Sequence, residues 1–157
     1  PLYDEPFVAA VPAGHPLAAG AQVTTEQLKR EHMLLLGTGH CFRDHVLHVC
    51  PEFGRFASSG DGIHKSFEGS SLETIKHMVA AGMGVTLVPR LAVPAADAQG
   101  ADGLLRYLPV VDDHPGAAPP TRRVVLAWRR SFTRYEAIAA LRNAVYACAL
   151  PGVQRLS

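Results

Sequence analysis

The residues best suited to covalent chemistry lie between positions 37 and 50, which hold two of the three cysteines of the chain. His40 precedes Cys41, Arg43 follows it by two residues, and Cys50 lies nine residues after Cys41. The thiolate is the nucleophilic form of cysteine, and neighbouring cations stabilise it relative to the thiol. A stabilised thiolate with a second thiol nearby in the sequence indicates redox chemistry, in which an oxidised cysteine can condense with the other to a disulfide.

Glycines and a proline set the limits of a short helix around these cysteines. Residues 37–39 read Gly-Thr-Gly and favour a turn, whereas residues 41–49 contain neither Gly nor Pro. Pro51 disfavours the helical conformation at the residue before it. The sequence therefore predicts a helix with Cys41 in its first turn and Cys50 at or past its end. Unpaired N–H groups in a first helical turn further stabilise a thiolate there.

The predicted helix keeps the two thiols apart. Nine residues at about 1.5 Å each separate them by roughly 13–14 Å, and nine steps of about 100° place them on opposite sides of the helix. A disulfide requires Cα atoms roughly 4.4–6.8 Å apart. Cys41 and Cys50 can therefore bond only if the segment unwinds, which would make their oxidation a conformational switch.

Two other interpretations of the segment stay open. Free cysteines are often small buried residues without reactivity, so both thiols could belong to the core. Alternatively, Cys41, His45 and His48 follow a spacing of four and three residues, which places them on one helical face, with His40 or Cys50 available as a fourth ligand. Thiolate and imidazole groups suit zinc, although the spacing matches no established zinc pattern.

Two motifs carry a resemblance to a known family. The first is Gly39-His40-Cys41-x-Arg43-Asp44 followed by Cys50, and the second is the run from Ser70 to Pro89, SSLETIKHMVAAGMGVTLVP. Together they resemble the OxyR group, which is the peroxide-sensing branch of the LysR-type transcriptional regulators. The resemblance implies that Cys41 reacts with hydrogen peroxide and that Cys50 resolves the product. It also implies roles for the motif positions His40, Arg43 and Asp44, whereas His45 and His48 lie outside the family pattern.

The resemblance also implies a fold, namely an α/β effector domain like the periplasmic binding proteins. Residues 6–95 would form its complete second lobe, with the redox segment 37–50, and residues 104–157 would return to a partial first lobe. The N-terminal DNA-binding domain would be absent. The alternation of strands and helices predicts a mainly parallel sheet covered on both faces. A partial first lobe should leave apolar surface on the last strand and helix, so we expect self-association, as a homodimer or tetramer, or contact with a missing segment.

The implied function is regulation of transcription rather than catalysis, with hydrogen peroxide as the signal and no cofactor or metal. Promoter DNA and RNA polymerase would be partners only of the full-length protein, because a net charge of +1 indicates no basic surface for DNA here. Three cysteines do not resemble a secreted disulfide framework, and no apolar run is long enough for a membrane span, so we expect a cytoplasmic protein. The alternatives are a small-molecule-binding effector domain of a LysR-type regulator without redox chemistry, and a metal-responsive domain.

Hydrophobic periodicity and turn residues predict the remaining elements. Strands are expected at 6–11, 33–36, 53–59, 85–88, 104–111 and 122–128, and helices at 25–30, 72–81 and 132–150, with a helical turn at 90–93. Capping boxes are expected at Thr24 with Gln27 and at Ser70 with Glu73. Tyr107, Trp128 and Cys148 are expected to be packing residues, and the arginines at 122 and 123 to be solvated.

Overall fold

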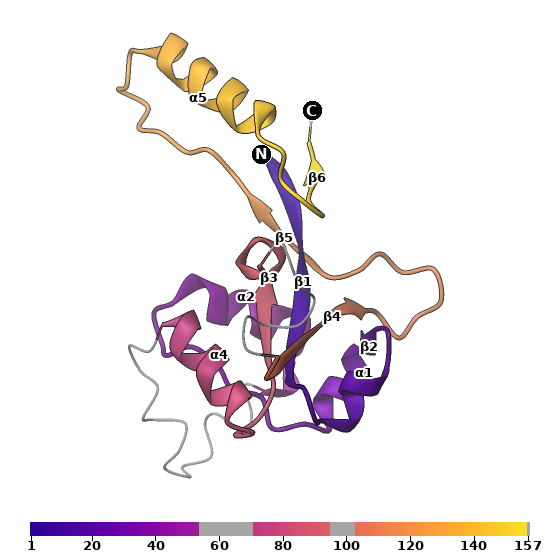
Figure 1. Ribbon diagram of the computed structural model, residues 1–157. Coiled ribbons are helices and arrows are strands. Elements are labelled where there is room, and N and C mark those ends of the chain that lie inside the picture. Colours follow the sequence, from indigo (N-terminus) through magenta and orange to yellow (C-terminus); the bar gives the residue numbers. More distant parts are fainter. Residues whose placement is uncertain (54–70, 95–102, 157) are drawn as a thin grey trace.

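The computed structural model describes residues 1–53, 71–94 and 103–156, and it divides into a body and an arm (Figure 1). Strand β1 (Tyr3–Pro12) runs through both. The body adds η1 (Pro16–Ala19), β2 (Val23–Thr24), α1 (Thr25–Lys29), α2 (Cys41–Val49), α4 (Leu72–Ala80), β3 (Thr86–Pro89), η3 (Arg90–Ala92) and β4 (Leu105–Val111). The arm consists of the start of β1 with β5 (Thr121–Val124), α5 (Tyr135–Ala147) and β6 (Gln154–Arg155).

The two ends of β1 pair with different partners. Residues 7–12 lie between β3 and β4, and β2 continues the sheet beyond β4, whereas residues 3–6 pair with β5 and β6. All four partners of β1 are antiparallel to it, and only β2 with β4 is parallel among the strand pairs described. The prediction of a mainly parallel sheet is therefore wrong. The α/β character is confirmed.

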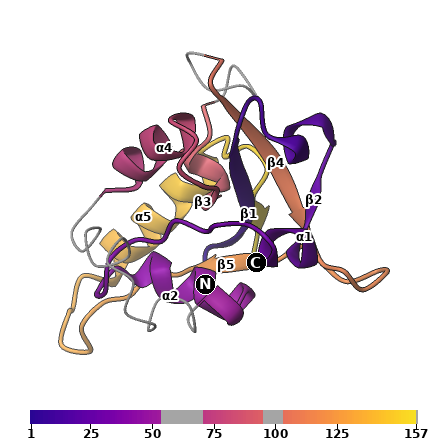
Figure 2. The ribbon, with the colours of Figure 1, turned by 90° about the horizontal axis from the view of Figure 1, so that it is seen from below.

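The core of the body forms where α4 packs on the sheet. Ile75 and Val79 lie one turn apart on α4 and are buried against β1, β3 and β4. Seen from below, α4 and α1 lie on opposite sides of the strands β3, β1 and β4 (Figure 2). Val11 and Leu108 are buried on the central strands of this sheet, so apolar burial holds the body together.

Most predicted elements of the body are confirmed near their predicted limits. The capping box of Thr24 with Gln27 is present at the start of α1, and Gly82 ends α4 with a φ of +80°. The second capping residue is Ser71, one residue later than expected, and its hydroxyl accepts from the Thr74 N–H. Residues 33–36 are buried as predicted but form a single parallel bridge, Met33 to Val85.

Some predictions differ from the structure or fall outside it. The predicted strand at 53–59, apart from its first residue, and the residue Ser70 lie outside the described residues. Strand β5 is shorter than the predicted 122–128, and α5 is shorter than the predicted 132–150.

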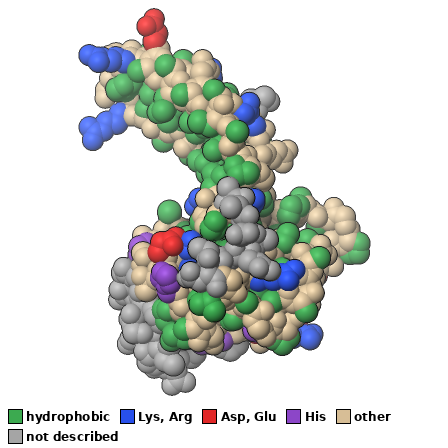
Figure 3. Space-filling model, viewed as in Figure 1, with side chains coloured by type: hydrophobic (Ala, Val, Ile, Leu, Met, Phe, Trp, Pro, Cys, Tyr) green, Lys and Arg blue, Asp and Glu red, His purple; other side chains and the backbone are tan. Residues whose placement is uncertain are grey.

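Apolar side chains are exposed along the arm, as the sequence predicts for its last strand and helix. Figure 3 shows them gathered over the arm, and Val125, Trp128, Tyr135 and Leu141 are each about half exposed or more. Trp128 is thus not the packing residue we expected, whereas Tyr107 in the body is buried as predicted. A contiguous apolar surface of this kind is typical of a face that contacts other polypeptide.

Candidate functional site

Helix α2 begins at Cys41, as the sequence predicts. Gly39 has a φ of +95°, a backbone conformation that favours glycine, and it turns the chain into the helix. His40 is the N-cap in an extended conformation, and its carbonyl accepts from the Arg43 N–H at 3.0 Å. The His40 ring makes no capping hydrogen bond. Cys41 is exposed in the first turn, beside helical N–H groups that have no partner within the helix.

Arg43 and Asp44 occupy the same first turn. The Arg43 guanidinium is half-buried, and its Nη1 donates to the Leu36 carbonyl at 2.9 Å. This bond ties the start of α2 to the buried segment that precedes the glycine turn. Asp44 is exposed, and its carboxylate stabilises the helix through the partial positive charge of the N-terminus.

Cys50 caps the other end of α2 in a very different environment. Cys50 is fully buried, and its N–H donates to the Val46 carbonyl at 2.9 Å. Burial, with a smaller contribution from the Glu52 carboxylate, raises the pKa of the Cys50 thiol from 9.0 to about 11. Cys50 therefore stays protonated at neutral pH. Phe42, Val46 and Cys50 share the buried side of the helix, whereas Cys41 faces solvent.

All three cysteines are free thiols in the structure. Cys41 and Cys50 lie at the two ends of an intact nine-residue helix, a separation of roughly 13–14 Å by helical rise. The intact helix therefore excludes a bond between them, and the unwinding that such a bond requires stays a prediction. Cys148, expected in the core, is instead exposed at the end of α5, because no layer among the described residues covers that helix.

Sequence reasoning missed three residues that form linked contacts next to α2, namely Phe7, Arg122 and Glu5. The Phe42 ring lies 5.7 Å from the Phe7 ring, and the Arg122 guanidinium lies over its face at 5.5 Å from the centroid. Arg122 also forms an ion pair with the fully buried carboxylate of Glu5 at 2.8 Å. The interpretation of Arg122 as a solvated arginine is therefore wrong. Its partner is 117 positions away in the sequence, and no local pattern connects the two residues.

An ion pair fixes the C-terminal end of the redox segment. Lys29, the last residue of α1, donates to Glu26 at 3.0 Å and lies 3.3 Å from a carboxylate oxygen of Glu52. Glu52 follows Cys50 by two residues, so this bridge ties the segment to α1 next to the buried thiol.

The metal interpretation receives no support from the described part of the chain. Within residues 1–53, 71–94 and 103–156, no three His, Cys, Asp or Glu side chains are grouped closely enough to hold a metal ion. His45 is half-buried, whereas Cys41 and His48 are exposed.

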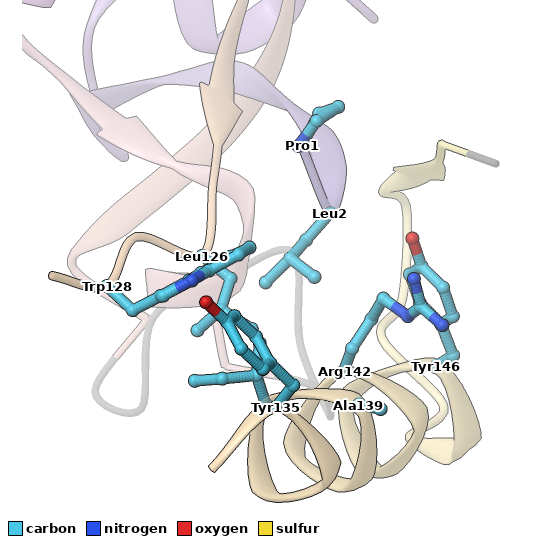
Figure 4. A pocket seen from close by; sticks show the side chains of 9 residues that line it. Pro1, Leu2, Leu126, Trp128, Tyr135, Ala139, Arg142 and Tyr146 are labelled. Carbon is cyan, nitrogen blue, oxygen red and sulfur yellow. The ribbon is translucent and has the colours of Figure 1, made fainter. Parts of the chain in front are cut away.

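An open cavity of about 580 Å³ lies in the arm. Figure 4 shows it between the start of β1, the segment after β5 and one face of α5, with Leu2, Leu126, Trp128, Tyr135 and Arg142 among its lining residues. Its walls are mostly apolar and belong to the exposed surface of the arm. No described helix has both the length and the hydrophobicity needed to cross a bilayer.

Comparison with known proteins identifies the domain. Residues 1–147 match the family model of the LysR substrate-binding domain. The chain is 38% identical over 142 residues to the DNA-binding transcriptional dual regulator OxyR of Escherichia coli K12, which covers 88% of this chain and 42% of that protein. The chain therefore spans less than half the length of this relative.

Solved structures agree with this result. The reduced form of OxyR from N. meningitidis has a TM-score of 0.84 and 38% identity, over all of this chain and 68% of that one. An oxidised form of OxyR has a TM-score of 0.68 and 35% identity, over 94% of this chain and 63% of that one. These matches confirm the periplasmic-binding-protein-like fold, and the relative from Escherichia coli is a transcriptional regulator. The chain belongs to the LysR substrate-binding domain family and, within it, to the OxyR branch.

Proposed function

We propose that this domain senses hydrogen peroxide for a LysR-type transcriptional regulator, through oxidation of Cys41 and its bonding to Cys50. The observation that carries the proposal is the contrast between the two ends of α2, where Cys41 is exposed at the N-terminus and Cys50 is buried as a protonated thiol. The existence of reduced and oxidised forms of the OxyR relatives supports a redox role.

In the first step, the Cys41 thiolate attacks one oxygen of the peroxide. A sulfur–oxygen bond forms, the O–O bond breaks, and the leaving hydroxide takes a proton to become water, which leaves a sulfenic acid on Cys41. N–H groups of the first turn, the His40 ring and the Arg43 guanidinium are the groups available to orient the peroxide and stabilise the leaving oxygen. Asp44 supports the turn through the helix dipole.

In the second step, Cys50 loses its proton and attacks the Cys41 sulfur. The disulfide forms, and the sulfenic oxygen leaves as water. This step requires Cys50 to leave its buried position, because the length of α2 keeps the two sulfur atoms apart, and the raised pKa of Cys50 lowers its thiolate fraction in the helical state. The buried thiol is thus held unreactive until the segment unwinds, and unwinding provides the change of shape that a regulator can transmit.

The same proposal extends to the partners, the cellular location and the lobes of the domain. The exposed apolar surface of the arm supports association with further polypeptide, either another part of the regulatory domain or a second copy in a homodimer or tetramer. Promoter DNA and RNA polymerase act through the full-length protein. The cytoplasm, which keeps thiols reduced until an oxidant arrives, suits this chemistry. Residues 6–95 are proposed to form the second lobe together with β4, because residues 105–111 pair with the body half of β1, so the predicted return to the first lobe over 104–157 is proposed to begin only after β4.

A thiol count with peptide mass spectrometry tests the proposal. Chelator-treated protein is exposed to one equivalent of hydrogen peroxide, and we expect the loss of two thiols and a crosslinked peptide joining Cys41 to Cys50. Cys148 should remain free and serves as the exposed control. The variant Cys50→Ser should stop at the sulfenic acid of Cys41, which dimedone traps. A small-molecule effector domain without redox chemistry would instead retain all three thiols.

A further inference from the structure

A continuous series of side-chain contacts leads from the redox helix to the arm. Phe42, the residue after Cys41, faces the Arg122 guanidinium at 5.5 Å, and Arg122 Nε and Nη2 each lie 2.8 Å from Glu5 Oε2. The other Glu5 oxygen accepts from the Leu91 N–H at 2.8 Å. We call Phe42, Arg122 and Glu5 the contact chain. It joins α2, β5, β1 and η3.

The contact chain lies where β1 passes from the arm into the body. Glu5 and Arg122 are directly paired residues in the β1–β5 ladder, just before β1 leaves the arm and enters the body. The Glu5 carboxylate is fully buried, and the Arg122 side chain is 25% exposed. A buried carboxylate depends strongly on its cation, and loss of one partner of such a pair is far more costly than loss of a surface pair. The position of Arg122 therefore controls how firmly β5 is held to β1.

Phe42 covers one face of that cation. A guanidinium over an aromatic face is stabilised most when water is kept away from it, and the Phe42 ring, itself packed on Phe7, provides this cover. The cover depends on helix α2, because the helical backbone directs Phe42 and Val46 to the same buried side. Unwinding of α2 would remove this constraint next to Cys41 and expose more of the Arg122 side chain, which is 25% exposed while the helix is intact.

We propose that Phe42 and Arg122 are positioning residues that couple the state of α2 to the pairing of β5 with β1, so that unwinding of the redox helix loosens the arm at Glu5. This inference rests on the proposed function for its trigger. The contact between Phe42 and Arg122 can nevertheless be tested in reduced protein without peroxide, so the two can fail separately.

Hydrogen–deuterium exchange of the β5 amides provides the test. The Leu2 amide, which donates to the Val124 carbonyl at 2.8 Å across this ladder, is followed together with the β5 amides, and peptides covering β4, which pairs with residues 8–12 of β1, serve as the internal reference. In reduced protein, Phe42→Leu keeps an apolar side chain but removes the aromatic face. We expect exchange of β5 to rise roughly three- to thirtyfold, the range that a cation–π contact corresponds to, with β4 unchanged.

A matched variant separates coupling from general destabilisation. Val46→Ala removes buried volume one turn further along the same side of α2, and it should leave β5 exchange at the wild-type level. Disulfide formation in the wild-type protein should raise β5 exchange, and in Phe42→Leu it should add little. The coupling is refuted if Phe42→Leu and Val46→Ala change β5 equally, or if a confirmed Cys41–Cys50 disulfide leaves β5 exchange unchanged. If the disulfide does not form but Phe42→Leu still raises β5 exchange, the peroxide trigger is refuted and the role of the contact between Phe42 and Arg122 is retained.

Discussion

Cys50 should react slowly with a disulfide reagent while the protein is folded. Burial raises the pKa of its thiol from 9.0 to about 11, so its thiolate fraction below pH 9 is about a hundredfold smaller than that of an ordinary cysteine. A more basic thiolate is intrinsically more nucleophilic, which recovers about six- to tenfold of this loss. The acid–base effect alone therefore slows Cys50 by at least about tenfold, and complete burial slows it further.

The assay uses Cys41→Ser, because a mixed disulfide on Cys41 could otherwise be attacked by Cys50. This variant retains one buried and one exposed thiol, and Cys148 serves as the reference within the same molecule. The modification of Cys50 and of Cys148 is followed by peptide mass spectrometry after brief exposure to dithiodipyridine at neutral pH. The measurement is made once on the folded protein and once on protein unfolded in urea. We expect Cys50 to lag Cys148 by at least about tenfold when native and to match it in urea. Equal native rates would refute the argument that the resolving thiol is stored in an unreactive form.

Three further predictions concern stability and switching. Because the pKa of Cys50 is higher in the folded protein, its contribution to stability is complete well below pH 9 and is lost as the pH rises through 11. Between pH 9 and pH 11, wild type should therefore lose about 2 kcal/mol more unfolding free energy than Cys50→Ala, as measured by urea denaturation. Lys29→Met removes the bridge to Glu52 and should speed disulfide formation a few-fold in stopped-flow experiments at low salt, with no difference from wild type at high salt. Gly84→Ala should lower the thermal midpoint by several degrees, because a Cβ there would lie 2.5 Å from the His32 carbonyl oxygen, and an unchanged midpoint would contradict this packing.

The redox helix could be predicted from the sequence because its limits are local. The Gly-Thr-Gly turn and Pro51 act on neighbouring backbone, and α2 occupies the predicted residues 41–49. The opposite placement of Cys41 and Cys50 also followed from helical geometry alone. The direction of the strands could not be predicted from the sequence. Alternation of strands and helices does not reveal a long strand such as β1, which is antiparallel to all its partners.

The contact chain could not be predicted because its members come together only in the folded protein. Glu5 lies in an early strand and Arg122 in a late one, and each alone resembles an ordinary charged residue at a strand end. Cys148 illustrates the opposite case. It lies on an apolar stripe that periodicity assigns to a core, but the layer that would cover α5 is not among the described residues. Periodicity identifies an apolar face without identifying what covers it.

The division of β1 between two sets of partners restricts which genetic changes this fold can accept. Residues 3–6 set the register with β5 and β6, and residues 7–12 set the register with β3 and β4. Side chains alternate along a strand, so inserting or deleting one residue in β1 would turn one half inside out relative to the other. Evolution can therefore change β1 by single substitutions, whereas the number of residues in β1 must stay constant.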